Sequence, residues 1–186
     1  MKRRRALTGG VAGVFLLAVA ALVGGPWVLT RLYPLEYREI LFLRAAERGL
    51  DPYLVAAVIR AESRFRPRAI SAQGARGLMQ IMPETGKWVA EQMEIPFDPE
   101  LLYDPDYNIR LGCWYLSNLL NEFDGNRVLA LAAYNGGRNN VKQWLAEERW
   151  TGEAHTLEQI PFGETRHYVA VVLRDHKRYQ WLYEKR

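Results

Sequence analysis

The chain has 186 residues, enough for one domain and a short appendage. Hydrophobic residues make up 49% and charged residues 25%, which is typical of a globular protein and argues against a disordered chain. Four of the 25 basic residues, Lys2, Arg3, Arg4 and Arg5, lie at the very start. Without them, 21 basic residues stand against 21 acidic ones, so the rest of the chain lacks the positive charge that a nucleic-acid partner would require.

An uncharged run over residues 6–30 follows the basic tail of residues 1–5. A helix needs about 20 apolar residues to cross a bilayer, and basic residues before it place the N-terminus in the cytoplasm. We therefore expect a single-pass anchor over 6–30 and an extracytoplasmic domain over 31–186, held at the cell membrane. A cleaved signal peptide is the alternative, because Ala18-Val19-Ala20 resembles a cleavage site, and it would give a secreted protein.

The domain is predicted to be mostly α-helical, because apolar residues recur at helical spacing and no segment alternates long enough for a strand. Asp51-Pro52 is typical of a helix start, with Asp51 as the N-cap and proline in the first turn. Residues 71–82 hold two glycines and predict a loop. The expected helices cover residues 36–48, 52–64, 83–93, 106–123, 128–134, 141–148 and 164–183.

Glu62 is a carboxylate on a helix face that is otherwise apolar, the stripe of Val55, Val58 and Phe65. Loss of hydration raises the pKa of a carboxyl group there, and the negative end of the helix dipole adds to the rise. A carboxyl that stays protonated near neutral pH can donate a proton to a glycosidic oxygen. Position alone also allows a surface glutamate that pairs with Arg66 at i+4.

The loop after Glu62 is rich in uncharged side chains. Ser71, Gln73 and Gln80 offer hydrogen-bond donors and acceptors, and Met82 offers adaptable apolar contact. The glycines let the backbone approach a ligand closely. This composition favours a groove for an uncharged sugar polymer over a phosphate site, which would require Gly-Lys-Ser/Thr spacing.

Three blocks follow one another in the chain: Glu62-Ser63-Arg64-Phe65 with Gly77-Leu78-Met79-Gln80-Ile81-Met82-Pro83, then Ala132-Ala133-Tyr134-Asn135-Gly136-Gly137, then Glu164-Thr165-Arg166-His167-Tyr168-Val169. In this order they resemble the lytic transglycosylases of the soluble lytic transglycosylase type, glycoside hydrolase family 23. The resemblance covers roughly residues 36–183. One departure is Gly136, where the family has alanine, and it is expected to loosen that turn.

The resemblance implies a lysozyme-like helical fold of the goose-type lysozyme/transglycosylase kind, with no cofactor. It also implies cleavage of the MurNAc–GlcNAc β-1,4 bond of peptidoglycan strands with a 1,6-anhydro-muramoyl product. Carried over by position, Glu62 is the catalytic acid and then base, and Tyr134 is expected to hydrogen-bond near its carboxyl group. The implied substrate-binding residues are Ser71, Gln80, Met82, Tyr134, Asn135 and Glu164.

Other functions fit parts of this pattern. A muramidase that uses water as the acceptor could employ the same Glu62, and a membrane-tethered peptidoglycan-binding module could use the groove without catalysis. A metal site is not expected, because His155, His167 and His176 fit no ligand spacing. Cys113 is the only cysteine, so no intrachain disulfide is possible, and its apolar neighbours predict a buried thiol.

Overall fold

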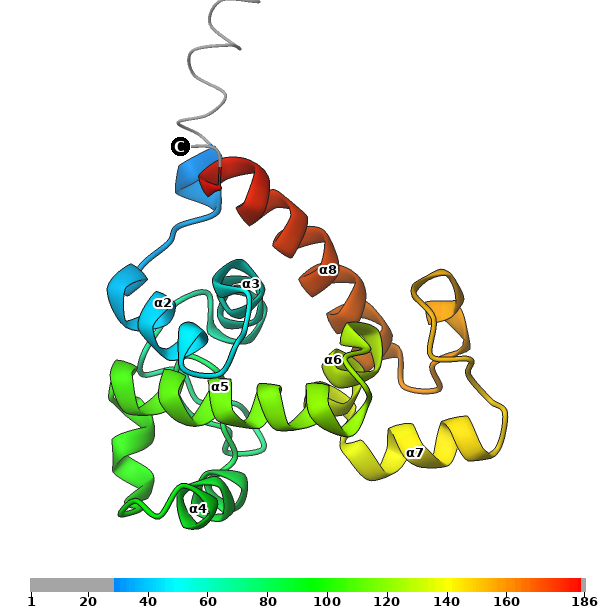
Figure 1. Ribbon diagram of the computed structural model, residues 1–186, viewed down its shortest axis with the longest axis horizontal. Coiled ribbons are helices and arrows are strands. Elements are labelled where there is room, and N and C mark those ends of the chain that lie inside the picture. Colours follow the sequence, from blue (N-terminus) through cyan, green and yellow to red (C-terminus); the bar gives the residue numbers. More distant parts are fainter. Residues whose placement is uncertain (1–28, 185–186) are drawn as a thin grey trace, which may run out of the picture.

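The computed structural model describes residues 29–184, and helices dominate this part of the chain (Figure 1). Extended pairing within it is limited to two isolated bridges, Ile70 with Arg76 and Arg76 with Ile81. Two 3₁₀ helices, η1 (Pro99–Tyr103) and η2 (Ala154–Gln159), lie in the connections. The α-helices are α2 (Arg38–Ala46), α3 (Pro52–Ser63), α4 (Pro83–Gln92), α5 (Pro105–Glu122), α6 (Arg127–Gly136), α7 (Arg138–Ala146) and α8 (Gly163–Tyr183).

The predicted helices agree with these bounds except around Gly137. The sequence predicted that Asn135-Gly136-Gly137 would end one helix and that the next would begin at Val141. Instead α6 continues through Gly136 and α7 begins at Arg138, so Gly137, with φ 87°, is the single residue between them. Gly136 is helical, and a Cβ there would lie 2.8 Å from Thr165 Oγ1. This glycine therefore brings α6 close to α8 rather than loosening a turn.

α3 is the central helix of the fold. Its N-cap is Asp51, as predicted, and the Asp51 carboxylate accepts a hydrogen bond of 2.8 Å from the Tyr53 amide. Every residue from Leu54 to Ile59 is buried, because α2 covers one side of the helix and α8 packs against the other. α8 also packs on α6 (Figure 1), so the long last helix joins the central helix to the α6–α7 pair.

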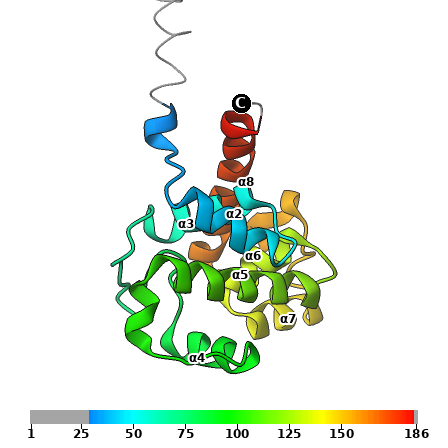
Figure 2. The same ribbon diagram turned by 60° about the vertical axis from the view of Figure 1, so that its left-hand side comes forward.

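Hydrogen bonds join the first described residues to the C-terminal turns of α8. Residues 29–32 are helical and lie at the same end of the molecule as the C-terminal turns of α8 (Figures 1 and 2). The hydroxyl of Tyr183 donates to the Tyr33 carbonyl at 2.7 Å, and the hydroxyl of Tyr179 donates to the Pro34 carbonyl at 2.8 Å. Tyr33 itself is only 4% exposed. The residues that lead into the domain are thus part of its folded body.

The expected anchor over residues 6–30 lies outside the described residues, apart from its last two positions. Among residues 29–184, no helix combines the length and the apolar character that a bilayer crossing requires. The anchor therefore stays a prediction from the sequence.

Candidate active site

Glu62 is the second-to-last residue of α3, which ends at Ser63. Arg64 and Phe65 follow with φ of 53° and 60°, two successive non-glycine residues in the left-handed region. Such a backbone is unfavourable and persists only where the surroundings hold it. Here Phe65 is 2% exposed and anchors the turn in the core, while the Ser63 hydroxyl donates to the Ile59 carbonyl at 3.1 Å. The turn thus fixes where the Glu62 side chain begins.

The Glu62 carboxyl group has a pKa raised to about 7. Burial is the main cause, since a carboxylate that loses hydration is costly to ionise. The negative charge of Glu164 raises the pKa further, whereas the Tyr168 hydroxyl favours the ionised form and acts against the shift. A carboxyl group with this pKa can both donate and accept a proton at neutral pH.

Two cavities meet at Glu62. The larger measures about 930 Å³ and the smaller about 480 Å³. Since the same side chains line both, they form one cleft with Glu62 at the junction; the shared residues are Glu62, Ser71, Gln80, Asn135 and Glu164. Met82 and Tyr134 line the smaller cavity. The structure therefore brings all seven predicted site residues to one cleft, while their individual roles remain predictions.

The loop of residues 71–82, which contributes Ser71, Gln80 and Met82 to the cleft, is held in place at Met79. Its amide donates to the Oδ1 of Asn108 at 2.7 Å, and its carbonyl accepts from the Tyr134 hydroxyl at 2.9 Å. Asn108 is fully buried and donates to the carbonyls of Arg76 and Leu102 as well. Tyr134 was predicted to hydrogen-bond near the Glu62 carboxyl, and the acceptor of its hydroxyl is the Met79 carbonyl. The ring does lie near Glu62, whose charge contributes to raising the Tyr134 pKa, but the hydroxyl secures the loop.

Several polar atoms of the wall are already bonded within the protein. The Ser71 hydroxyl accepts from the Ala75 amide at 3.1 Å, and the Gln80 side chain donates to the carbonyls of Ala69 and Gly77. Asn135 Oδ1 accepts from the Thr165 hydroxyl at 2.8 Å. These bonds orient the side chains. Within the described chain, these bonds leave the side-chain Oε1 of Gln80 and the side-chain Nδ2 of Asn135 available to a ligand.

Comparison with known proteins identifies the domain. Residues 40–157 match the family model described as the Transglycosylase SLT domain. The chain belongs to this family. The soluble lytic murein transglycosylase of Escherichia coli (strain K12) is 36% identical over 162 residues, which cover 84% of this chain and 25% of that protein. The membrane-bound lytic murein transglycosylase C of Yersinia pestis (strain Pestoides F) is 30% identical over 167 residues, or 78% of this chain and 47% of the relative.

Solved structures agree with this assignment. The 70 kDa soluble lytic transglycosylase of Escherichia coli superposes with a TM-score of 0.78 at 35% identity, over 87% of this chain and 27% of that one. An inactive mutant of the lytic transglycosylase Slt from Pseudomonas aeruginosa gives 0.77 at 42% identity, over 82% of this chain and 25% of that one. The predicted family and the predicted mostly α, lysozyme-like fold are confirmed. The chain spans about a quarter of the length of these solved relatives.

Tyr168 lines the larger cavity of this SLT domain, but no role was predicted for it from the sequence. It lies one turn after Glu164 on α8, and positions i and i+4 share a helix face, so the assignment of Glu164 could have drawn attention to it. Its buried hydroxyl has no hydrogen bond of regular geometry within the described chain, although it lies within reach of Glu62 and lowers the Glu62 pKa. Phe162 is exposed and lines the smaller cavity, and no role was predicted for it either.

Two substitutions should move the pH dependence of activity in opposite directions. Tyr168→Phe removes the group that favours the ionised Glu62, so the Glu62 pKa should rise above about 7. Glu164→Gln removes a negative charge and should lower it. If Glu62 is the predicted general acid, it works only while protonated, so the loss of activity with rising pH should shift upward in the first variant and downward in the second. The measurement is kcat/KM against pH; shifts in the same direction would contradict the assignment.

The other titratable groups of the described chain do not suggest a metal centre. Between residues 29 and 184, His, Cys, Asp and Glu side chains nowhere gather in a group of three or more that could hold an ion. Cys113 is fully buried, as predicted, and burial raises the pKa of its thiol to about 12. Such a thiol is a poor nucleophile at neutral pH.

Proposed function

We propose that this chain is a peptidoglycan lytic transglycosylase that cleaves the MurNAc–GlcNAc β-1,4 bond and leaves 1,6-anhydro-muramoyl ends. The observation that carries the proposal is a partly buried glutamate with a pKa near 7 at the junction of two cavities. Among the described residues, Glu62 and Glu164 are the carboxylates that line this cleft. The relatives named lytic murein transglycosylases, and the bulgecin A complex of the 70 kDa enzyme, support the same class of substrate.

The proposed mechanism uses one carboxyl group twice. Protonated Glu62 donates its proton to the glycosidic oxygen as the bond to the anomeric carbon breaks. The N-acetyl group of the substrate stabilises the oxocarbenium-like centre, as in substrate-assisted glycosidases. Glu62, now a carboxylate, accepts the proton of the C6 hydroxyl while that oxygen closes the anhydro ring. A pKa near 7 suits both steps, because neither protonation state is strongly disfavoured.

The surroundings of Glu62 support this assignment of roles. Glu164 is exposed at the start of α8 and lines the same cleft as Glu62. Its charge then helps to hold Glu62 protonated before the first step. We infer that the neutral groups of the smaller cavity, among them Ser71, Gln80, Met82 and Asn135, position the uncharged sugar rings. The inactive mutant of the Pseudomonas aeruginosa relative carries a glutamate-to-glutamine change, which is consistent with one essential glutamate.

We also propose that residues 6–30 anchor the domain to the cell membrane, with the cleft on the extracytoplasmic side. The uncharged run behind a basic tail supports this, and one relative is named as membrane-bound. The full chain should then stay with membranes after a high-salt or alkaline wash. A chain that begins at Arg31 should be released by the same wash, and a full-length chain found in the supernatant would overturn the anchor.

The experiment that tests the activity uses purified peptidoglycan, the domain from Arg31 to Arg186 and its Glu62→Gln variant. Released muropeptides are weighed by mass spectrometry. The proposal expects muramoyl ends one water lighter than the reducing sugar, formed by the native domain and not by the variant. Reducing ends would make the protein a muramidase. No release, with both proteins still bound to the wall, would make it a binding module.

A further inference from the structure

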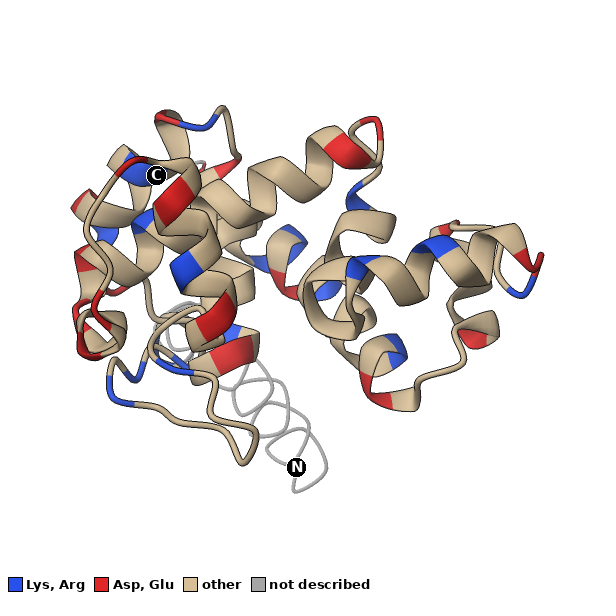
Figure 3. Cartoon of the chain, turned by 90° about the horizontal axis from the view of Figure 1, so that it is seen from below, with Lys and Arg blue, Asp and Glu red and all other residues tan. Residues whose placement is uncertain are grey.

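One face of the last turns of α8 is exposed and basic, and it carries a tryptophan. Positions i, i+3, i+4 and i+7 of a helix share one face. On α8 these positions hold four exposed side chains, Arg174, Lys177, Arg178 and Trp181. The exposed acidic residue of the same turns is Glu184. Acidic and basic positions are mixed over the helices of the described chain (Figure 3), so this run of basic residues is a local feature of α8.

Trp181 is the exposed tryptophan of the described chain. Its side chain is 61% exposed, whereas Trp88 and Trp114 are half-buried and Trp144 and Trp150 are buried. A large aromatic ring is usually well buried in a folded protein, so an exposed one points to a surface that meets a partner. Tryptophan is enriched where proteins meet the headgroups of a membrane, because its ring is apolar and its N–H group is polar.

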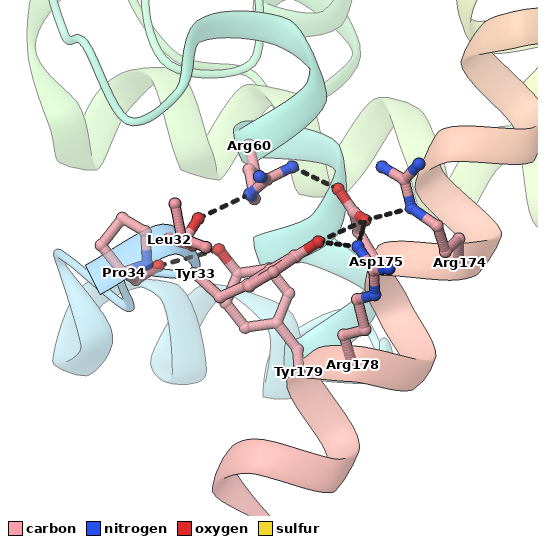
Figure 4. A network of polar contacts seen from close by, with 8 residues as sticks. All are labelled: Leu32, Tyr33, Pro34, Arg60, Arg174, Asp175, Arg178 and Tyr179. Atoms are coloured by element: carbon pink, nitrogen blue, oxygen red, sulfur yellow. Dashed lines mark hydrogen bonds and ion pairs between the residues drawn. The ribbon is translucent and has the colours of Figure 1, made fainter. Parts of the chain in front are cut away.

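The basic face of α8 lies beside the residues that lead into the domain. The Arg178 guanidinium donates to the Tyr33 hydroxyl (Figure 4), and Leu32, the residue before Tyr33, is 56% exposed. Residues 29–32 lie at the same end of the molecule as the C-terminal turns of α8 (Figures 1 and 2). The uncharged run of residues 6–30 ends two positions before Leu32. A bilayer crossed by that run would therefore begin within a few residues of this end of the domain.

We propose that this end of the domain lies on the surface of the membrane that holds the anchor. Leu32 and Trp181 enter the headgroup region there. Lys177 and Arg178 lie against the phosphate groups of anionic phospholipids, because such lipids attract basic side chains near the surface. The inference rests on the proposed anchor and does not depend on the reaction at Glu62. A tether alone leaves a domain free to rotate, whereas docking of α8 holds the cleft at one orientation and one distance from the membrane.

The test uses the full chain in two kinds of vesicle: phosphatidylcholine alone, and an equal mixture of phosphatidylcholine and phosphatidylglycerol. Glu184→Cys provides a site for a fluorescent maleimide one turn after Trp181. The Cys113 thiol does not compete for the label, because burial raises its pKa to about 12. Lipids that carry a nitroxide on the headgroup quench the label when α8 lies on the surface. Quenching should be stronger in the vesicles with phosphatidylglycerol, and added salt should weaken it.

Two variants measure what the basic face contributes. Lys177→Gln should lower the ratio of docked to undocked domain about fivefold in the vesicles with phosphatidylglycerol, the effect of one basic residue at an anionic surface. Trp181→Ala should lower the ratio as well. Lys87→Gln is the matched control, because Lys87 is an exposed cation on α4. α4 lies at the opposite end of the molecule from the C-terminal turns of α8 (Figures 1 and 2).

The inference is wrong if the label is quenched equally in the two kinds of vesicle, or if Lys87→Gln lowers the ratio as much as Lys177→Gln. Lys177→Gln and Trp181→Ala should unfold at the same temperature as the native chain, because both side chains are exposed, and this separates lost docking from misfolding. If an alkaline wash removes the native chain from both kinds of vesicle, it is the proposed anchor that fails, and the inference fails with it.

Discussion

Replacement of Glu62 by glutamine should reduce the release of anhydro-muropeptides by about 10³-fold or more. General acid–base catalysis contributes about 10²–10⁴-fold in enzymes, and here one group would serve in both proton transfers. Glutamine keeps the size and the hydrogen-bonding capacity of the side chain, so binding to the wall should persist. The initial rate of product release is the measurement, and near-native activity of the variant would rule out Glu62 as the acid.

The same substitution should stabilise the protein at high pH. The Glu62 pKa is raised from 4.5 to about 7, so the folded state binds the proton more tightly than the unfolded state. The resulting cost is absent below about pH 4.5, grows between 4.5 and 7, and is complete above about 7. At about 1.4 kcal/mol per pH unit this corresponds to roughly 3 kcal/mol. Because the side chain is only partly buried, solvent screening should reduce it to about 2 kcal/mol.

Denaturant unfolding at pH 5 and pH 8 measures this effect. The free energy of unfolding of Glu62→Gln should exceed that of the native protein clearly at pH 8 and only slightly at pH 5. Glu91→Gln is the control, because the Glu91 carboxylate is exposed and does not line the cleft, so its loss should change stability by less than about 0.5 kcal/mol. An equal gain at both pH values would mean that the cost of ionising Glu62 is not the cause.

Asp175→Asn should destabilise the domain by about 3–5 kcal/mol. Asp175 is fully buried and compensates the charges of Arg60, Arg174 and Arg178. Loss of one partner of a buried ion pair leaves the remaining charge without compensation, which costs this much in other proteins. Asparagine keeps only one acceptor oxygen, whereas the Tyr33 hydroxyl and Arg60 bind different oxygens of the Asp175 carboxylate, so both contacts cannot be kept and residues 31–34 would be held less firmly. Since the arginines keep some contact with water, the lower end of the range is expected.

The control for this effect is Glu158→Gln, which removes the 2.9 Å ion pair of Glu158 with Arg166. Glu158 is 88% exposed, and exposed pairs are worth about 0–1 kcal/mol. Urea unfolding of both variants beside the native domain makes the comparison. Similar small losses in the two variants would show that the folded state does not depend on the compensation of Arg60, Arg174 and Arg178 by Asp175.

Local signals explain why so much of the fold followed from the sequence. Asp51-Pro52 started α3 as expected, because a cap and a first-turn proline act within a few residues. The turn at Gly137 was harder to predict from the sequence, because Asn135 and Gly136 also favour the end of a helix. Packing of α6 against Thr165 decided that α6 continues through Gly136.

The sequence by itself determined the helices, the family and the position of Glu62 on an apolar helix face, because helical spacing and short ordered motifs are properties of neighbouring residues. The tertiary structure alone decided which distant side chains meet. It turned the Tyr134 hydroxyl to the Met79 carbonyl and placed Tyr168 beside Glu62. It also joined Arg60 to Asp175, 115 positions later in the chain. These contacts depend on how α3, α6 and α8 pack, and no local pattern records the relative position of two helices.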